Sequence, residues 1–168
     1  MDEQTVPTRA IPNFDQRVTQ IGDKLDKIIE GRQLAFSAED PEINEIFTLP
    51  AEHLGKMPVQ KLEEYSFILS RYNVYLRREL NKQRGLLNWA KKSMDFIVLP
   101  NMHQYREPYM SIDEIKMRAI KDHDVAQKFY KFIIDKDNEI ITIEELNTDI
   151  RKMADTLSGI AKTKKFSN

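Results

Sequence analysis

Between Arg71 and Phe96 basic residues alternate with aromatic residues at helical spacing. The steps are 4, 3, 4, 3, 4, 3 and 4, so the side chains line one seam of a helix. We call this set the basic–aromatic stripe: Arg71, Tyr75, Arg78, Lys82, Gly85, Trp89, Lys92 and Phe96. A parallel row that recurs every seven residues adds Arg77, Arg84 and Lys91.

This combination suits a single-stranded nucleic acid. Cations bind phosphates, arginine also stacks on bases, and each stacked ring contributes about 1–3 kcal/mol per base. The same stripe also suits packing against another subunit, because Tyr75, Trp89 and Phe96 are large apolar groups and Gly85 permits a close approach. The pattern leaves both hypotheses open, and an oligomer could combine them.

Charge along the chain agrees with a basic middle segment. Residues 1–57 carry 11 acids and 6 bases, a net charge of -5, and residues 58–134 carry 9 acids and 14 bases, a net charge of +5. Residues 135–168 carry 7 acids and 6 bases, so the whole chain has a net charge of only -1. A local excess of this kind favours polyanions even in a neutral chain, although a solvated helix face would look the same.

The elements that position these residues are predicted to be helices, and we expect an elongated all-α protein. Only 5 of the 168 residues are glycine, and prolines are absent from 59–99 and after 108. We predict a short helix after Asn13 that stops at Gly31, and one long central helix over about 58–99 with Pro58 in its first turn. Its core face carries Leu62, Tyr65, Leu69, Tyr72, Leu76, Leu80, Leu87, Ala90 and Met94. A helix of about 60 Å is long for one small domain, so we expect an oligomer.

Two shorter C-terminal helices are expected from capping boxes. Ser111–Glu114 predicts a helix to about Ile134, and Thr142–Glu145 predicts another to about Ala161. A short strand at 140–143 is an alternative for the segment between them, and the basic end from Lys162 is expected to fray. The predicted organisation is an acidic arm over 1–57, with one short helix and a loop, and a helical oligomerisation and nucleic-acid-binding domain over 58–168.

Residues for catalysis or for holding a cofactor are scarce. The chain has no Cys, only three isolated His residues and no glycine-rich phosphate loop. Asp135–Leu146 imitates a calcium loop but has Ile140 in place of the required Gly and Leu146 in place of the last Glu. We therefore expect no enzyme activity, no cofactor and no metal site. No long apolar run or signal sequence is evident, so a cytoplasmic protein is expected, in the host cell if a phage encodes it.

The pattern over about 62–160 resembles the UvsY-like recombination mediators of tailed phages. The likeness rests on Tyr72–Asn81 in a long helix, on Glu114–Lys116, Ala119–Asp122 and Asp124–Lys128, and on a last helix with Met153–Ile160. The resemblance implies a ring-like homo-oligomer that binds single-stranded DNA and helps a RecA-type recombinase to replace the single-strand-binding protein. It also implies Lys116 and Lys121 as secondary DNA contacts, beside the bases from Arg71 to Lys92.

A competing hypothesis is a structural or assembly helical protein of a phage particle, with no role in nucleic-acid binding. It would use both helical stripes for packing. A third hypothesis is a small regulator that binds a polymerase through its acidic N-terminal region.

Overall fold

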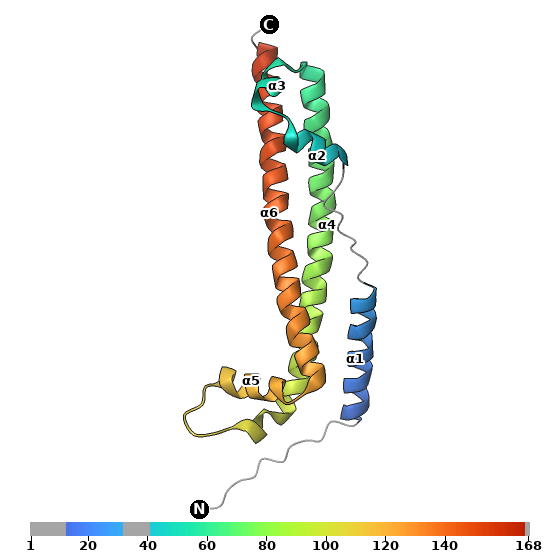
Figure 1. Ribbon diagram of the computed structural model, residues 1–168, viewed down its shortest axis with the longest axis vertical. Coiled ribbons are helices and arrows are strands. Elements are labelled where there is room, and N and C mark those ends of the chain that lie inside the picture. Colours follow the sequence, from blue (N-terminus) through green and yellow to red (C-terminus); the bar gives the residue numbers. More distant parts are fainter. Residues whose placement is uncertain (1–12, 32–40, 167–168) are drawn as a thin grey trace, which may run out of the picture. The chain divides into compact units, whose positions relative to one another are not determined.

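The computed structural model describes residues 13–31 and 41–166, and every regular element in these ranges is helical. Figure 1 shows their order along the chain. The all-α prediction is therefore confirmed. The elements are α1 (Phe14–Glu30), α2 (Pro41–Thr48), α3 (Ala51–Lys56), α4 (Val59–Val98), the 3-10 helix η1 (Leu99–Tyr105), α5 (Ile112–Lys121) and α6 (Asp124–Phe166).

The predicted ends of the first two helices agree with the structure to within one or two residues. Asn13 precedes α1 but lies in the left-handed region, with φ 58°, and its side chain makes no capping hydrogen bond. Pro58 precedes α4, where its carbonyl accepts hydrogen bonds from the N–H groups of Lys61 and Leu62. The long helix then tightens into η1, which accommodates Pro100 in its first turn.

The C-terminal part differs from the prediction in three ways. The helix expected over 111–134 ends at Lys121, because the turn at Asp122 and His123 separates α5 from α6. The break expected between Ile134 and Thr142 is wrong, and so is the alternative of a strand at 140–143, because α6 runs through both as one helix of 43 residues. Burial explains the continuity: Ile140 and Ile143 are 8% and 6% exposed and lie one helical turn apart.

The two predicted capping boxes have different outcomes. At Ser111 the box is formed: the Glu114 N–H donates to Ser111 Oγ at 3.2 Å, and the Ser111 N–H donates to Glu114 Oε2 at 2.8 Å. The hydrogen bond from the Ser111 backbone lowers the pKa of Glu114. At Thr142 there is no cap, because its hydroxyl donates to the Asn138 carbonyl oxygen inside α6.

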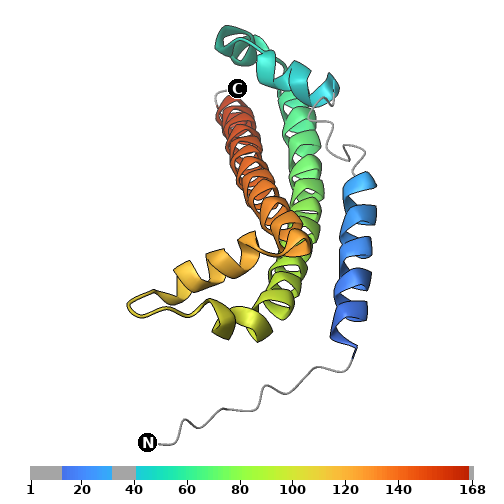
Figure 2. The same cartoon turned by 60° about the horizontal axis from the view of Figure 1, so that its bottom comes forward.

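The chain divides into two compact units, each with its own core. The first unit contains α1, the part of α4 from Leu86 onward, η1, α5 and α6 up to Lys136. Figure 2 shows η1 leaving the end of α4 and leading into the loop before α5. The core of the first unit includes Leu25 of α1, Ala90 and Ile97 of α4, and Phe129 and Phe132 of α6. The helix α1 is thus an integral part of this core.

The second unit contains α2, α3, α4 up to Gly85 and α6 from Asp137. Here α4 and α6 pack antiparallel, and the buried α4 residues include Leu62, Leu69 and Leu76. Polar links tie the pair: Ser66 Oγ donates to the Ala154 carbonyl oxygen at 2.9 Å, and Asn73 Nδ2 donates to Asn147 Oδ1 at 2.8 Å. The predicted core face of α4 is confirmed.

The basic end of the chain is also ordered within the second unit as far as Phe166. Lys164 Nζ donates to the Met57 carbonyl oxygen at 2.7 Å, and Lys165 Nζ lies 2.6 Å from Glu63 Oε1. The fraying expected from Lys162 onward is therefore wrong for Lys162–Phe166, because these lysines bind the start of α4 and the end of α3.

Candidate nucleic-acid interface

The basic–aromatic stripe of α4 has an outward-facing half in the second unit. Because Leu69, Leu76 and Leu80 point into the core, the stripe residues on the other side of the helix are exposed. We call this the open half: Arg71, Tyr75, Arg78, Lys82 and Gly85. Arg77 and Arg84 of the parallel row are exposed as well.

Three arginines of this surface have no carboxylate partner in the described part of the chain: Arg71, Arg77 and Arg78. The Arg71 guanidinium lies 5.9 Å from the centroid of the Phe67 ring. Between Tyr65 and Gly85 the helix carries one acid, Glu79, and that side chain is buried. These three arginines consequently give the surface its positive charge.

Two other bases of the surface are ion-paired. Lys82 Nζ binds the buried Glu79 carboxylate, and this hydrogen bond raises the pKa of Lys82. Arg84 Nη2 lies 2.5 Å from Glu144 Oε1 of α6. Arg84 also borders a polar groove of about 620 Å³ between α4 and α6, lined by Arg77, Leu80, Asn81, Arg84, Glu144, Asn147 and Thr148.

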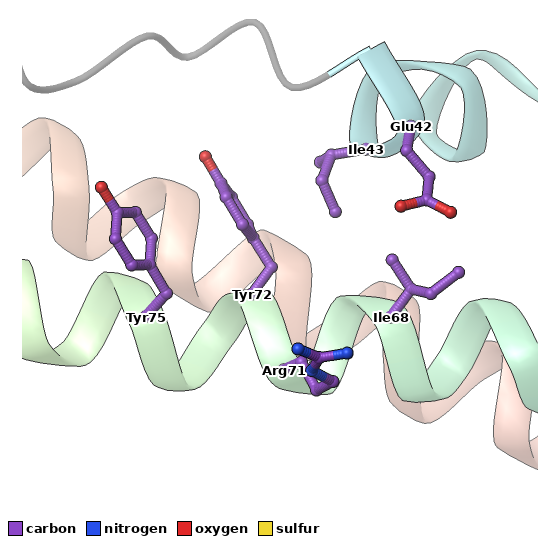
Figure 3. Close-up of a pocket in the computed structure, with 6 residues that line it drawn as sticks. All are labelled: Glu42, Ile43, Ile68, Arg71, Tyr72 and Tyr75. Atoms are coloured by element: carbon purple, nitrogen blue, oxygen red, sulfur yellow. The ribbon is translucent and has the colours of Figure 1, made fainter.

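Tyr75 is the ring that the open half presents to solvent. Its side chain is 44% exposed, and it stacks on Tyr72 with 5.8 Å between ring centroids and 29° between ring planes. The two tyrosines border a hollow between α2 and α4 (Figure 3). One aromatic face is therefore available beside the arginines.

The other half of the stripe lies in the first unit, and α1 covers its rings. We call it the covered half: Trp89, Lys92 and Phe96. Trp89 packs edge-on against Phe129 at 5.5 Å, and Lys24 Nζ lies 4.9 Å from the centre of its ring. Phe96 packs against Phe14 at 5.5 Å. The packing hypothesis places these two rings against another subunit, whereas the structure packs them against α1 and α6 of the same chain.

The remaining predicted contacts also lie in the first unit. Lys91, Lys92 and Lys121 are exposed. Lys116 Nζ binds Asp95 Oδ1 at 2.6 Å, so its charge is partly neutralised within the unit. The structure thus brings six of the eleven predicted residues together on α4 of the second unit: Arg71, Tyr75, Arg77, Arg78, Lys82 and Arg84. The other five, Trp89, Lys91, Lys92, Lys116 and Lys121, belong to the first unit.

Sequence reasoning missed several residues at the open half. Phe67 and Val74 are 64% and 51% exposed beside Arg71 and Arg78, so this surface is more apolar than predicted. The sequence pattern places Tyr72 on the predicted core face, although its position three residues before Tyr75 also puts the two rings one turn apart. Glu42 and Ile43 of α2 face the same hollow, and no local pattern connects them to α4.

Comparisons with known proteins add no information about this surface. No family model, no curated protein and no solved structure matches the chain. Within residues 13–31 and 41–166, no group of His and acidic side chains could hold a metal ion. None of the helices in those ranges combines the length and the apolar composition that crossing a bilayer requires.

Proposed function

We propose that this protein binds single-stranded DNA without sequence preference and helps a RecA-type recombinase to assemble on it. The observation that carries the DNA-binding part is the surface of α4 at the open half and the neighbouring Arg77, where Arg71, Arg77 and Arg78 are exposed without an acidic partner among residues 13–31 and 41–166. Such cations bind backbone phosphates and release counterions, which gives affinity without base recognition. The loading part, with the single-strand-binding protein as a further partner, is supported by the resemblance over 62–160.

The first test is fluorescence anisotropy of a labelled single strand of about 30 nucleotides, titrated across a salt series. For single strands, log affinity falls with log salt by about 0.7 for each phosphate neutralised. The double variant Arg77→Glu with Arg78→Glu removes two contacts, so we expect weaker binding and a slope shallower by about 1.4. In a strand-exchange assay, the same variant should lose its stimulation of a RecA-type recombinase on protein-coated DNA.

A matched control is the double variant Arg151→Glu with Lys152→Glu. It makes the same change in net charge on exposed positions of α6 in the same unit. We expect this control to retain most of the affinity and of the salt slope. Equal losses in the two double variants would contradict a binding site on α4. Lys82 is a poor choice for this test, because its removal would leave the buried Glu79 carboxylate without its partner.

One observation favours a second candidate function, a structural or assembly protein of a phage particle. Phe67 and Val74 are exposed on the same face as the arginines, and packing against another helix would bury them. Light scattering of the Arg77→Glu/Arg78→Glu variant distinguishes the two functions. A smaller assembly with unchanged DNA affinity would favour the structural role, and lost affinity in an unchanged assembly would favour the DNA-binding role.

A further inference from the structure

A hollow of about 280 Å³ lies between α2 and α4 in the second unit. It is open to solvent on one side, and Figure 3 shows the side chains around it. Two elements that are far apart in the sequence build it, with Glu42 and Ile43 from the first turn of α2 and four residues from two turns of α4. The lining residues are Glu42, Ile43, Ile68, Arg71, Tyr72 and Tyr75.

The walls of the hollow suit a flat ring. The Tyr72 and Tyr75 rings stand together on one side, and Ile43 and Ile68 lie on the other (Figure 3). Ile43 is 4% exposed and belongs to the core of the unit, so its position is fixed by packing. An aromatic face opposite an aliphatic surface stacks on a planar ring and excludes water from both of its faces.

The rim of the hollow carries charges of opposite sign. Arg71 provides a cation on the side of α4, and the Glu42 carboxylate lies on the side of α2 (Figure 3). A phosphate is attracted by the first and repelled by the second, so an anionic ligand has one favoured orientation. The matching chemistry is a planar heterocycle that carries a phosphate at one end and hydrogen-bond donors on its far edge.

We infer that this hollow binds one unpaired nucleotide of a bound single strand, an inference that rests on the function proposed above. The base lies between the tyrosines and the isoleucines, and its phosphate lies against Arg71. Because a carboxylate only accepts hydrogen bonds, Glu42 favours cytosine, which offers an amino group, over thymine, which offers a carbonyl oxygen at that position. Binding is thus sequence-tolerant along the strand, with a preference for cytosine over thymine at one position in each site.

The test compares labelled 30-nucleotide strands of deoxycytidine, of thymidine and of abasic sugar–phosphate units. We expect the deoxycytidine strand to bind most tightly. Tyr75→Ala should weaken its binding by about 5-fold to 150-fold, the range for one stacked base, and should leave the abasic strand unaffected. Tyr75→Phe keeps the ring and should retain the affinity. Tyr130→Ala, at an exposed tyrosine of α6 in the first unit, is the matched control.

The outcomes separate this inference from the proposed function. Equal affinity for the deoxycytidine and abasic strands, unchanged in Tyr75→Ala, would overturn the pocket and leave phosphate binding in place. Failure to bind any strand at low salt would overturn both. Circular dichroism confirms that each variant is folded.

Two further arms test the ligand. Glu42→Gln should reduce the preference for deoxycytidine over thymidine, and equal binding of these strands by the unmodified protein would overturn the role of Glu42. Free deoxycytidine monophosphate should compete with the strand only at millimolar concentrations. If free deoxycytidine monophosphate competes at lower concentrations than an unlabelled strand does, the assignment to strand DNA is overturned and a free nucleotide is the ligand.

Discussion

The open and covered halves of the stripe on α4 continue one alternation of bases and rings, yet their rings have different environments. In the open half Tyr75 is 44% exposed beside arginines that have no acidic partner in the described part of the chain. In the covered half, α1 supplies Phe14 against Phe96 and Lys24 against Trp89. The comparison shows that spacing identifies a face of a helix, whereas the packing of other segments decides whether that face binds a ligand or joins a core.

The fit of α1 explains why only one half is covered. Val18, Gly22 and Leu25 form its buried face, and a Cβ at Gly22 would lie 3.3 Å from Val125 Cγ1. The glycine therefore allows α1 to approach α6 closely within the first unit. In the second unit α2 contributes Ile43 beside Tyr72 but leaves Tyr75 exposed.

The largest expected effect is a difference in stability between variants of the covered half and of the open half. Trp89→Ala removes the contact with the fully buried Phe129 and should lower the free energy of unfolding by about 3 kcal/mol. Tyr75→Ala removes an exposed ring and should cost only about 0.5 kcal/mol. Urea unfolding followed by circular dichroism measures both values. Similar losses in the two variants would mean that the halves do not differ in packing.

A smaller effect is expected at the glycines. A Cβ at Gly85 would meet no atom of the described residues within 4 Å, so Gly85→Ala should raise the free energy of unfolding by about 1 kcal/mol through helix propensity. Gly22→Ala gains the same propensity but must displace Val125, so its net gain should be smaller. Thermal unfolding of the two variants provides the measurement. A larger gain at Gly22 than at Gly85 would contradict the close packing of α1.

The smallest effect is a dependence on alkaline pH in the open half. The hydrogen bond to Glu79 raises the pKa of Lys82 above its ordinary value of 10.5. Its contribution to stability is therefore fully present below pH 10.5 and is lost as the pH rises through the higher folded-state pKa. In urea unfolding, Lys82→Ala should be less stable than the unmodified protein at pH 8, and the difference should shrink toward pH 12. A constant difference would show that the ion pair does not cause it.

Much of the fold follows from local sequence patterns. The apolar stripe from Leu62 to Met94 fixes both the length and the buried face of α4, and Ser111 with Glu114 marks the start of α5. Thr142 with Glu145 shows the same four-residue pattern inside a helix, where burial of Ile140 and Ile143 holds the backbone helical on both sides. A local motif cannot report that burial, since it depends on contacts with other parts of the fold.

The candidate site was predictable to a similar degree. The exposed arginines follow from their spacing relative to Leu69 and Leu76, which the sequence shows directly. The burial of Trp89 by α1 could not be predicted in this way. The apolar residues of α1 indicate that this helix packs against another element, but they do not indicate which one. The contact of Arg84 with Glu144 spans 60 positions, and the hollow depends on where α2 lies beside α4. Such long-range placements require the folded structure.

The polar links between α4 and α6 also select one alignment of the two helices. Two antiparallel helices with leucine and isoleucine stripes could slide past each other by about seven residues and still bury apolar surface. After such a slip, Asn73 would lose Asn147 and Ser66 would lose the Ala154 carbonyl oxygen, and the separated groups would remain half-buried without partners. These polar links therefore specify the register of the pair, and with it which α6 side chains stand beside the arginines of α4.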